Sequence, residues 1–287
     1  MDSFWEDVMH NEEDYVISEG FTEYNEESED VEEIEEYYGL ETMDLVEKCS
    51  RTLDDYFLRM RHNEVHRNVV IDGANILHSS GFSNDRGSFH TTANPEILLS
   101  WIRYFLVNDF EVMAIVPDNF ISDRSSPHAD ILKILVDVYL ICVPQDLRVC
   151  DDEVILDYAR LSDGLILSGD NYVDHIKKPE MERLTNENRV GPSIKTTALP
   201  EREWFHLTCD GTHWLAYHSL QFIYPQEVDE ESRRSRFFST PSSSRHELVV
   251  NKRRAWNEGR RRKCLSAVDE AIYMLLSREK RHLISVQ

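Results

Sequence analysis

The sequence lacks several features that mark common protein classes. It has no run of 18 apolar residues, and acidic residues stand where a signal peptide would carry positive charge. Its five cysteines include no CxxC pair, which argues against a disulfide framework and against a zinc finger. Neither a GxGxxG loop nor a P-loop is present. We therefore expect a soluble intracellular protein with reduced thiols and no membrane partner.

Positive charge is missing from the first 47 residues, which hold 19 Asp or Glu and no Lys or Arg. Residues 232–263, by contrast, hold eleven Lys or Arg against two Glu. The formal net charge of -23 would normally argue against nucleic-acid binding, but most of that charge lies at one end. We expect residues 1–47 to form a disordered acidic head that binds protein partners. Residues 229–287 are expected to form a basic linker and a C-terminal helix.

Between these ends, short apolar runs alternate with helical periods. Residues 48–65 predict an amphipathic lead-in helix, and residues 66–228 predict one domain. We predict strands over residues 68–75, 111–118, 139–145 and 164–170. Helices are predicted between and after them, over residues 95–109, 126–138, 150–163 and 171–185. The last helix is interrupted at Pro179, a hairpin follows over 203–217, and a linker covers 237–247. Strands that are apolar on both faces and alternate with helices indicate an α/β fold with a doubly wound parallel sheet.

Aspartates occur where the predicted strands end or the next helix begins. These residues are Asp72, Asp118, Asp151, Asp152, Asp170 and Asp174. Ligands of an open parallel sheet lie outside the carboxyl ends of its strands, so we expect Asp72, Asp152, Asp170 and Asp174 to gather there. Four carboxylates repel one another unless a divalent cation is bound, and an all-oxygen ligand set favours Mg²⁺ or Mn²⁺ over zinc. For Asp118 and Asp163 an ordinary turn position is a better explanation than a cation site. Asp151 is also explained by a favourable interaction with the dipole of the helix that it begins.

Two stretches carry a family resemblance. "VVIDGANILHS", from Val69, and "RVCDDEVILDYARLSDGLILSGDNYVD", from Arg148, resemble the NYN branch of the PIN-like ribonucleases, and within it the Regnase (MCPIP) type. The resemblance covers roughly residues 66–185. It implies a Rossmann-like, PIN/NYN-like fold and a Mg²⁺-dependent endoribonuclease, with Mn²⁺ as an alternative ion, that cleaves single-stranded RNA or mRNA.

The resemblance also implies roles for individual residues. It places the metal ligands on Asp72, Asp151, Asp152, Asp170 and Asp174. Of these, Asp72, Asp152, Asp170 and Asp174 are expected to be catalytic, with Asp152 or Asp174 accepting the proton of the attacking water. Asn75, Arg148, Lys177 and Lys178 are candidates for RNA contacts, and Tyr172 and His175 are candidates for stacking on bases, although packing inside the domain fits Tyr172 equally well.

Two departures from the family pattern bear on function. Gly169 stands where the family usually has Asn, and no Cys and His cluster after Tyr224 supplies the family's CCCH zinc finger. RNA targeting is then expected from the basic tail or a partner. Finger-less members include nucleases of RNA interference, so we expect a role in RNA silencing or mRNA decay, in the cytoplasm or its RNA granules, with the nucleus left open.

Two other classes of function stay open at this stage, as does a homo-oligomeric state. The chain is alternatively a catalytically inactive NYN-fold protein that binds RNA or acts as a scaffold in a silencing complex. A site that takes a phosphorylated small molecule, or a phosphoryl group on Asp72, is disfavoured because the Lys and Ser/Thr pattern of such enzymes is missing.

Overall fold

A computed structural model of the protein describes residues 59–79, 95–122, 128–144, 150–176, 179–196, 218–225 and 228–285. Several predictions lie outside these residues: the acidic head, the lead-in helix up to residue 58, and the hairpin over 203–217. The three basic residues Arg148, Lys177 and Lys178 lie outside them as well. The helix predicted over 48–65 is wrong at its end, because residues 59–64 are not helical and Val65 begins a strand.

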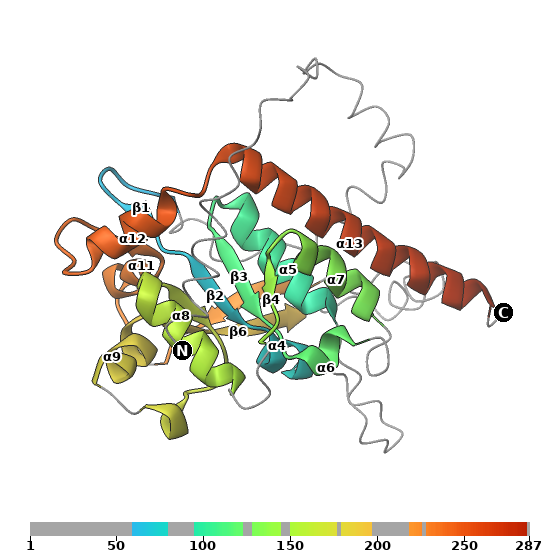
Figure 1. The fold of residues 1–287 in the computed structure, drawn as a ribbon, viewed down its shortest axis with the longest axis horizontal. Helices are drawn as coiled ribbons and strands as arrows, with labels where there is room; N and C mark the ends of the chain where they lie inside the picture. The colour runs from blue at the N-terminus through green and yellow to red at the C-terminus, as the bar shows by residue number, and fades with distance from the viewer. Residues whose placement is uncertain are drawn as a thin grey trace, which may run out of the picture. The chain divides into compact units, whose positions relative to one another are not determined.

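A six-stranded sheet forms the centre of the domain (Figure 1). In spatial order its strands are β4 (Ile141–Cys142), β3 (Val112–Ile115), β2 (Val69–Asp72), β5 (Leu165–Leu167), β6 (Arg189–Thr196) and β7 (His218–Ile223). All neighbours are parallel except β6 and β7. Every residue of β2 and β5 is buried, as expected for strands covered on both faces. The predicted α/β fold with a doubly wound, mostly parallel sheet is confirmed.

The chain reverses direction across the sheet between β2 and β5. From β2 it winds outward through β3 to β4, and from β5 it winds the opposite way through β6 to β7. This reversal is the topological switch point of a doubly wound sheet, where ligands bind beyond the carboxyl ends of the strands. Asp72 ends β2, and Asp170 follows β5 by three residues. The fold therefore brings these two acidic positions to the same edge.

Helices cover the sheet as predicted, with two corrections. The helices of this region are α4 (Gly73–Ser79), α5 (Pro95–Val107), α6 (Asp118–Ile121), α7 (Ala129–Asp137), α8 (Asp151–Ser162) and α9 (Pro179–Glu187). Helix α8 packs against β2, β3 and β5, while α5 packs against β3. No helix among the described residues is long and apolar enough to cross a membrane.

The first correction concerns Gly73, which was predicted inside a strand ending at residue 75 but begins α4. A Cβ on Gly73 would lie 2.7 Å from the carbonyl oxygen of Ile115, so glycine permits the close approach that turns the chain directly into a helix. The second concerns Pro179. Residues 171–185 contain a short 3₁₀ turn, η2 (Val173–His175), and Pro179 begins α9 instead of interrupting a helix, because proline's missing N–H costs nothing in the first turn.

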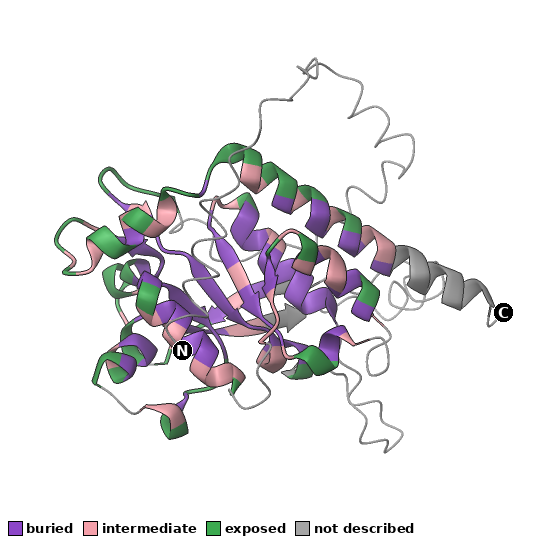
Figure 2. Ribbon diagram, in the orientation of Figure 1, coloured by how far each residue is buried: buried purple, intermediate pink, exposed green. Residues whose placement is uncertain are grey.

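The C-terminal region packs onto the domain. It consists of α11 (Glu230–Phe237), β8 (Phe238–Ser239), α12 (His246–Arg253) and α13 (Glu258–Ser285). Helix α13 lies across α5 and α7, and it buries Val268, Ala271, Ile272 and Leu275 (Figures 1 and 2). The C-terminal helix was predicted, but its coverage of the core was not.

The linker predicted over 237–247 is wrong at its start. Phe237 and Phe238 are fully buried in the core. Strand β8 pairs antiparallel with β1 (Val65–His66), which directly precedes the central strand β2. The Ser- and Pro-rich residues that follow suggested a linker, but two adjacent aromatic side chains gain more from burial than such a segment loses in chain entropy.

Part of the basic charge in this region is used inside the domain. Arg234 pairs with Glu64, Lys252 with Glu111 at 3.0 Å, and Arg253 with Asp109. The side chains of Arg234 and Glu64 are 3% and 5% exposed, so this pair is sealed from solvent. These cations stabilise the attachment of the C-terminal region, and they are not free to contact a ligand.

Candidate active site

Asp72 is a buried carboxylate with three hydrogen-bond donors. Its Oδ1 atom accepts a hydrogen bond of 2.9 Å from the backbone N–H of Asn75. Its Oδ2 atom accepts from the hydroxyl of Ser168 at 2.7 Å and from the phenol of Tyr172 at 3.0 Å. Burial raises the pKa of Asp72 despite these bonds, and the charge of Asp152 acts in the same direction. A carboxylate has about four acceptor positions, so Oδ1 keeps one for a further ligand.

The residues after β5 form a tight hydrogen-bonded turn around Asp72. The Ser168 hydroxyl accepts a bond of 3.0 Å from the backbone N–H of Asp170 while it donates to Asp72. Asp170 Oδ1 in turn accepts from the N–H of Tyr172 at 2.9 Å. Tyr172 adopts a left-handed backbone conformation with φ of 56°, which turns its ring inward. It is buried, so of the two roles left open for Tyr172 the structure favours packing over stacking on bases, and the residue positions Asp72.

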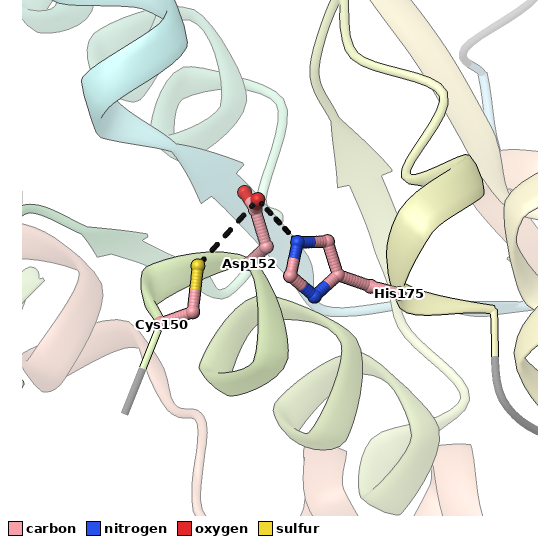
Figure 3. Close-up of side chains that lie close together, drawn as sticks. All are labelled: Cys150, Asp152 and His175. Atoms are coloured by element: carbon pink, nitrogen blue, oxygen red, sulfur yellow. Dashed lines mark hydrogen bonds and ion pairs between the residues drawn. The ribbon is translucent and has the colours of Figure 1, made fainter. Parts of the chain in front are cut away.

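Asp152 approaches the same site from the first turn of α8. Its Oδ2 atom lies 3.1 Å from Nε2 of His175 and 3.7 Å from the thiol sulfur of Cys150 (Figure 3). Burial raises the pKa of Asp152, and the charges of Asp151 and Asp170 add to that effect, while His175 opposes it. Because Asp152 interacts with both Asp72 and Asp170, the three carboxylates form one electrostatic cluster. Asp151 lies beside it.

Asn75 connects the ends of β2 and β5. Besides its backbone bond to Asp72, its side-chain Oδ1 accepts a hydrogen bond of 3.0 Å from the N–H of Gly169. A Cβ at Gly169 would lie 3.1 Å from that oxygen, tighter than most contacts, so glycine suits this position. Asn75 was predicted to contact RNA, and its side-chain oxygen is engaged inside the protein.

The other predicted residues lie outside this cluster. Asp174 is exposed on η2, and no hydrogen bond or ion pair within the described part of the chain joins it to the three carboxylates. Asp118 begins α6 beyond the neighbouring strand β3 and is exposed, as expected for a turn residue.

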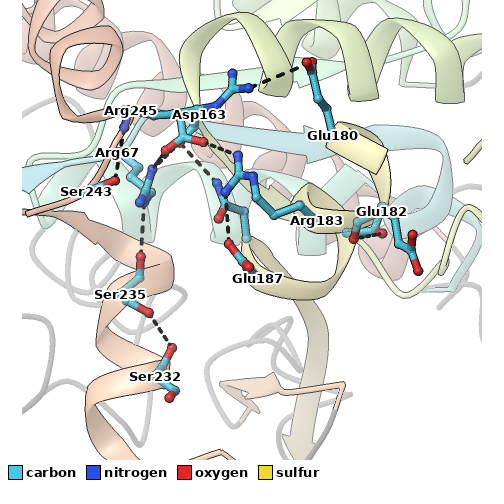
Figure 4. Close-up of polar contacts among 12 residues, drawn as sticks. Arg67, Asp163, Glu180, Glu182, Arg183, Glu187, Ser232, Ser235, Ser243 and Arg245 are labelled. Carbon is cyan, nitrogen blue, oxygen red and sulfur yellow. Dashed lines mark hydrogen bonds and ion pairs between the residues drawn. The ribbon is translucent and has the colours of Figure 1, made fainter. Parts of the chain in front are cut away.

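Asp163 is the centre of a separate, buried ion-pair network (Figure 4). It caps the C-terminus of α8 in a left-handed conformation with φ of 48° and pairs with Arg67 and Arg183. Burial alone would raise the pKa of Asp163, but the two guanidinium groups outweigh it and hold the pKa below its ordinary value. Its turn role was predicted, and the arginine partners show why an aspartate is tolerated there.

Arg189 is a residue near the site that the sequence did not suggest. It begins β6, a strand that was not predicted, and its Nη1 atom donates to the carbonyl of Ser168 at 3.4 Å. Its Nε atom is buried without a hydrogen-bond partner, and no ion pair within the described residues neutralises it. It interacts electrostatically with Asp170 and Tyr172, so it places a positive charge beside the carboxylates.

Comparison with known families agrees with this geometry. Residues 65–203 match the family model of the Zc3h12a-like ribonuclease NYN domain. Over these residues the chain is similar to that family. The match confirms the Regnase-type resemblance, and it suggests an RNA endonuclease activity of the kind for which such domains typically use a divalent metal ion. No curated protein matches the chain.

Proposed function

We propose that the chain is an endoribonuclease that cleaves single-stranded RNA or mRNA with a bound Mg²⁺ or Mn²⁺ ion. The observation that carries the proposal is the convergence of Asp72, Asp152 and Asp170 at the switch point of a sheet of the NYN ribonuclease family. Burial raises the pKa of Asp72 and of Asp152, and neighbouring carboxylates add to both shifts, so the arrangement is costly for a protein without a cation. The arrangement is consistent with a site selected to bind one.

The residues present fit a hard cation. Asp72, Asp152 and Asp170 would hold it through carboxylate oxygens, with Asp151 beside them as a further candidate ligand; Asp174, the other candidate from the sequence, lies outside the cluster. When bound, such an ion offsets the carboxylate repulsion, lowers the pKa of a water molecule and stabilises charge on the scissile phosphate. Ser168 and Tyr172 fix the orientation of Asp72 by donating to its Oδ2 atom, which leaves Oδ1 to face the ligand.

Asp152, His175 and Arg189 have proposed roles in the reaction. Asp152 is placed to accept the proton of the attacking water, and Nε2 of His175, 3.1 Å from Asp152 Oδ2, is placed to share that proton. Asp174 was an equal candidate for proton acceptor, but its exposed position away from the cluster makes it the weaker one. Arg189 lies beside Asp170 without a neutralising partner among the described residues, which suits a contact to an RNA phosphate.

A cleavage assay tests the proposal. The full chain is incubated with a fluorescently labelled single-stranded RNA in millimolar Mg²⁺, with EDTA, and as the variant Asp72→Asn. We expect cleavage only by the unaltered chain in Mg²⁺. Asp118→Asn is a matched control, because Asp118 also follows a strand of the sheet but is exposed. Equal cleavage by Asp72→Asn, or undiminished cleavage in EDTA, would overturn the assignment; RNA binding without cleavage would favour the inactive scaffold.

The biological process that we propose is RNA silencing or mRNA decay in the cytoplasm. It is supported by the absence of a CCCH finger from the sequence after the nuclease domain, which is typical of the family's members in RNA interference. Protein partners are proposed to bind the acidic residues 1–47. Stabilisation of the protein's target transcripts after its depletion from cells is the expected result.

A further inference from the structure

Cys150, Asp152 and His175 bring three different metal-binding atoms together. One ligand atom from each residue lies within 4.8 Å of the others, and all three side chains are partly accessible or exposed (Figure 3). We propose that these residues form a second cation site, which takes Zn²⁺ or a similarly thiophilic divalent ion and competes with the nuclease cation for Asp152. Binding of Zn²⁺ to this site does not depend on the proposed nuclease activity, whereas the inhibition of cleavage rests on that proposed function.

The distances suit one small ion. Zinc lies about 2.3 Å from a thiolate sulfur and about 2.0 Å from an imidazole nitrogen or carboxylate oxygen, so two donors on one tetrahedral ion are roughly 3–4 Å apart. Asp152 Oδ2 is 3.1 Å from His175 Nε2 and 3.7 Å from Cys150 Sγ. Small side-chain rotations are sufficient to place an ion among the three atoms.

The three residues lie on two different segments that each follow a strand of the sheet. Cys150 and Asp152 lie at the start of α8, after β4, and His175 ends η2, after β5. The side chains of Asp152 and His175 are 25% and 24% exposed, and Cys150 is exposed, so an ion from solvent has access. Asp151 Oδ1 lies 3.6 Å from Cys150 Sγ but is not among the three mutually close donors. Three protein donors with a water in the fourth position match a ligand set that zinc takes in proteins.

The donor set determines which ion is preferred. Mg²⁺ binds oxygen ligands and holds its waters, whereas a thiolate and an imidazole favour Zn²⁺, Co²⁺ or Cd²⁺. Asp152 belongs to both groups of ligands, since it interacts with Asp72 and Asp170 as well as with His175. An ion held by Cys150 and His175 therefore withdraws Asp152 from the all-oxygen cluster. Zinc acts in this arrangement as an inhibitor that leaves the fold unchanged.

Cobalt spectroscopy tests the binding step without any need for activity. The full chain, purified without a histidine tag, is titrated with Co²⁺, and the thiolate-to-cobalt charge-transfer absorption is followed in the near ultraviolet. We expect the band in the unaltered chain and in Cys142→Ser, a matched control because Cys142 is a partly buried free thiol on β4. Cys150→Ser should abolish the band, and His175→Gln should weaken it. A band that survives Cys150→Ser, or no band in any protein, overturns the proposal.

Zinc inhibition tests the competition. In the cleavage assay with Mg²⁺ in excess, Zn²⁺ should inhibit the unaltered chain, and half-inhibition of Cys150→Ser should need at least about tenfold more zinc, because a direct ligand is lost. Inhibition with the same zinc dependence in both proteins would refute the shared site. If no protein cleaves RNA, the nuclease assignment fails while the cobalt result still decides the metal site.

Discussion

The phenol of Tyr172 donates a hydrogen bond of 3.0 Å to the carboxylate of Asp72, across 100 positions of sequence. The bond joins the end of β2 to the turn after β5, on the two sides of the switch point. It depends on the left-handed backbone of Tyr172, a conformation that a non-glycine residue adopts only when its surroundings compensate for the strain. Burial raises the pKa of the Tyr172 phenol well above its ordinary value, so it stays a donor.

Removal of this donor should destabilise the protein. Tyr172→Phe leaves a buried charged acceptor with one hydrogen bond fewer, which costs about 2 kcal/mol of unfolding free energy. Urea unfolding measures the difference. Tyr139→Phe is the control, because Tyr139 is 65% exposed and also has positive φ. Equal stability of the two variants would show that the phenol does not support Asp72.

The charge of Asp72 should make stability depend on pH. The folded-state pKa is raised, so the folded protein binds a proton more tightly than the unfolded chain, and stability falls as pH rises from the unfolded value near 3.8 through the folded value. Asp72→Asn resembles the protonated form. In EDTA we expect it to be more stable than the unaltered protein at pH 7 and to lose that advantage as pH falls toward 3.8. An advantage that is constant with pH would contradict this origin.

Divalent cations should stabilise the folded protein. At about ten times its Kd, a cation that binds only the folded state adds about 1.4 kcal/mol, or about 3–6 °C in Tm for a domain of this size. Differential scanning fluorimetry with Mg²⁺ or Mn²⁺ measures the shift. Asp170→Ala should remove most of it, whereas Asp174→Asn, at an exposed residue outside the cluster, should retain most of it. An unchanged shift in Asp170→Ala would place the ion elsewhere.

Asp163 should be far more important for stability than its turn position suggests. Asp163→Asn leaves Arg67 and Arg183 without their shared carboxylate, and breaking a buried pair in this way costs about 3–5 kcal/mol. Asp157→Asn, on the same helix, breaks only the partly exposed pair with Arg160 and should cost less than about 1 kcal/mol. Because the pKa of Asp163 is lowered, its contribution is present above pH 3.8 and is lost as pH falls through the folded value. Chemical denaturation at pH 7 compares the two.

Whether the C-terminal region contacts RNA is best tested with point variants. Deletion of the chain from Ser232 onward would remove the basic residues 232–263, but it would also take away Phe237, Phe238 and α13, and we expect such a chain not to fold. Arg254 and Lys263 are exposed and have no ion pair in the described residues. Their double change to Gln should reduce the slope of log K against log salt by roughly 0.7 per lost contact. An unchanged slope would show that these two residues do not contact RNA.

The sequence predicted the central architecture because β2, β3 and β5 are short runs of apolar residues between helical periods. It also predicted that Asp72, Asp152 and Asp170 would approach one another, since the carboxyl ends of parallel strands share an edge. It did not reveal β6, because Gly191 and Pro192 within that strand are residues that strands usually avoid. Arg189 was missed with it.

Contacts between residues far apart in the sequence were the other feature that the sequence did not predict. The sequence could not decide between base stacking and packing for Tyr172, because its left-handed backbone and its reach to Asp72 depend on the turn after β5. Phe237 and Phe238 were read as a linker because the partner strand β1 is only two residues long and carries no local pattern of its own. A contact between positions about 170 residues apart leaves no periodicity in either segment.

The pairing of β1 with β8 has a consequence for the order in which the protein folds. Residues 65 and 66 pair with residues 239 and 238, and the backbone N–H of Arg67 donates to Phe237. Arg234 adds an ion pair to Glu64 across 170 positions. A chain leaving the ribosome N-terminus first cannot form these contacts until nearly all of it has been synthesised. The segment that leads into Asp72 is fixed last, so folding is slowed by a large loop closure, and the growing chain needs protection from aggregation for longer than a protein with local contacts does.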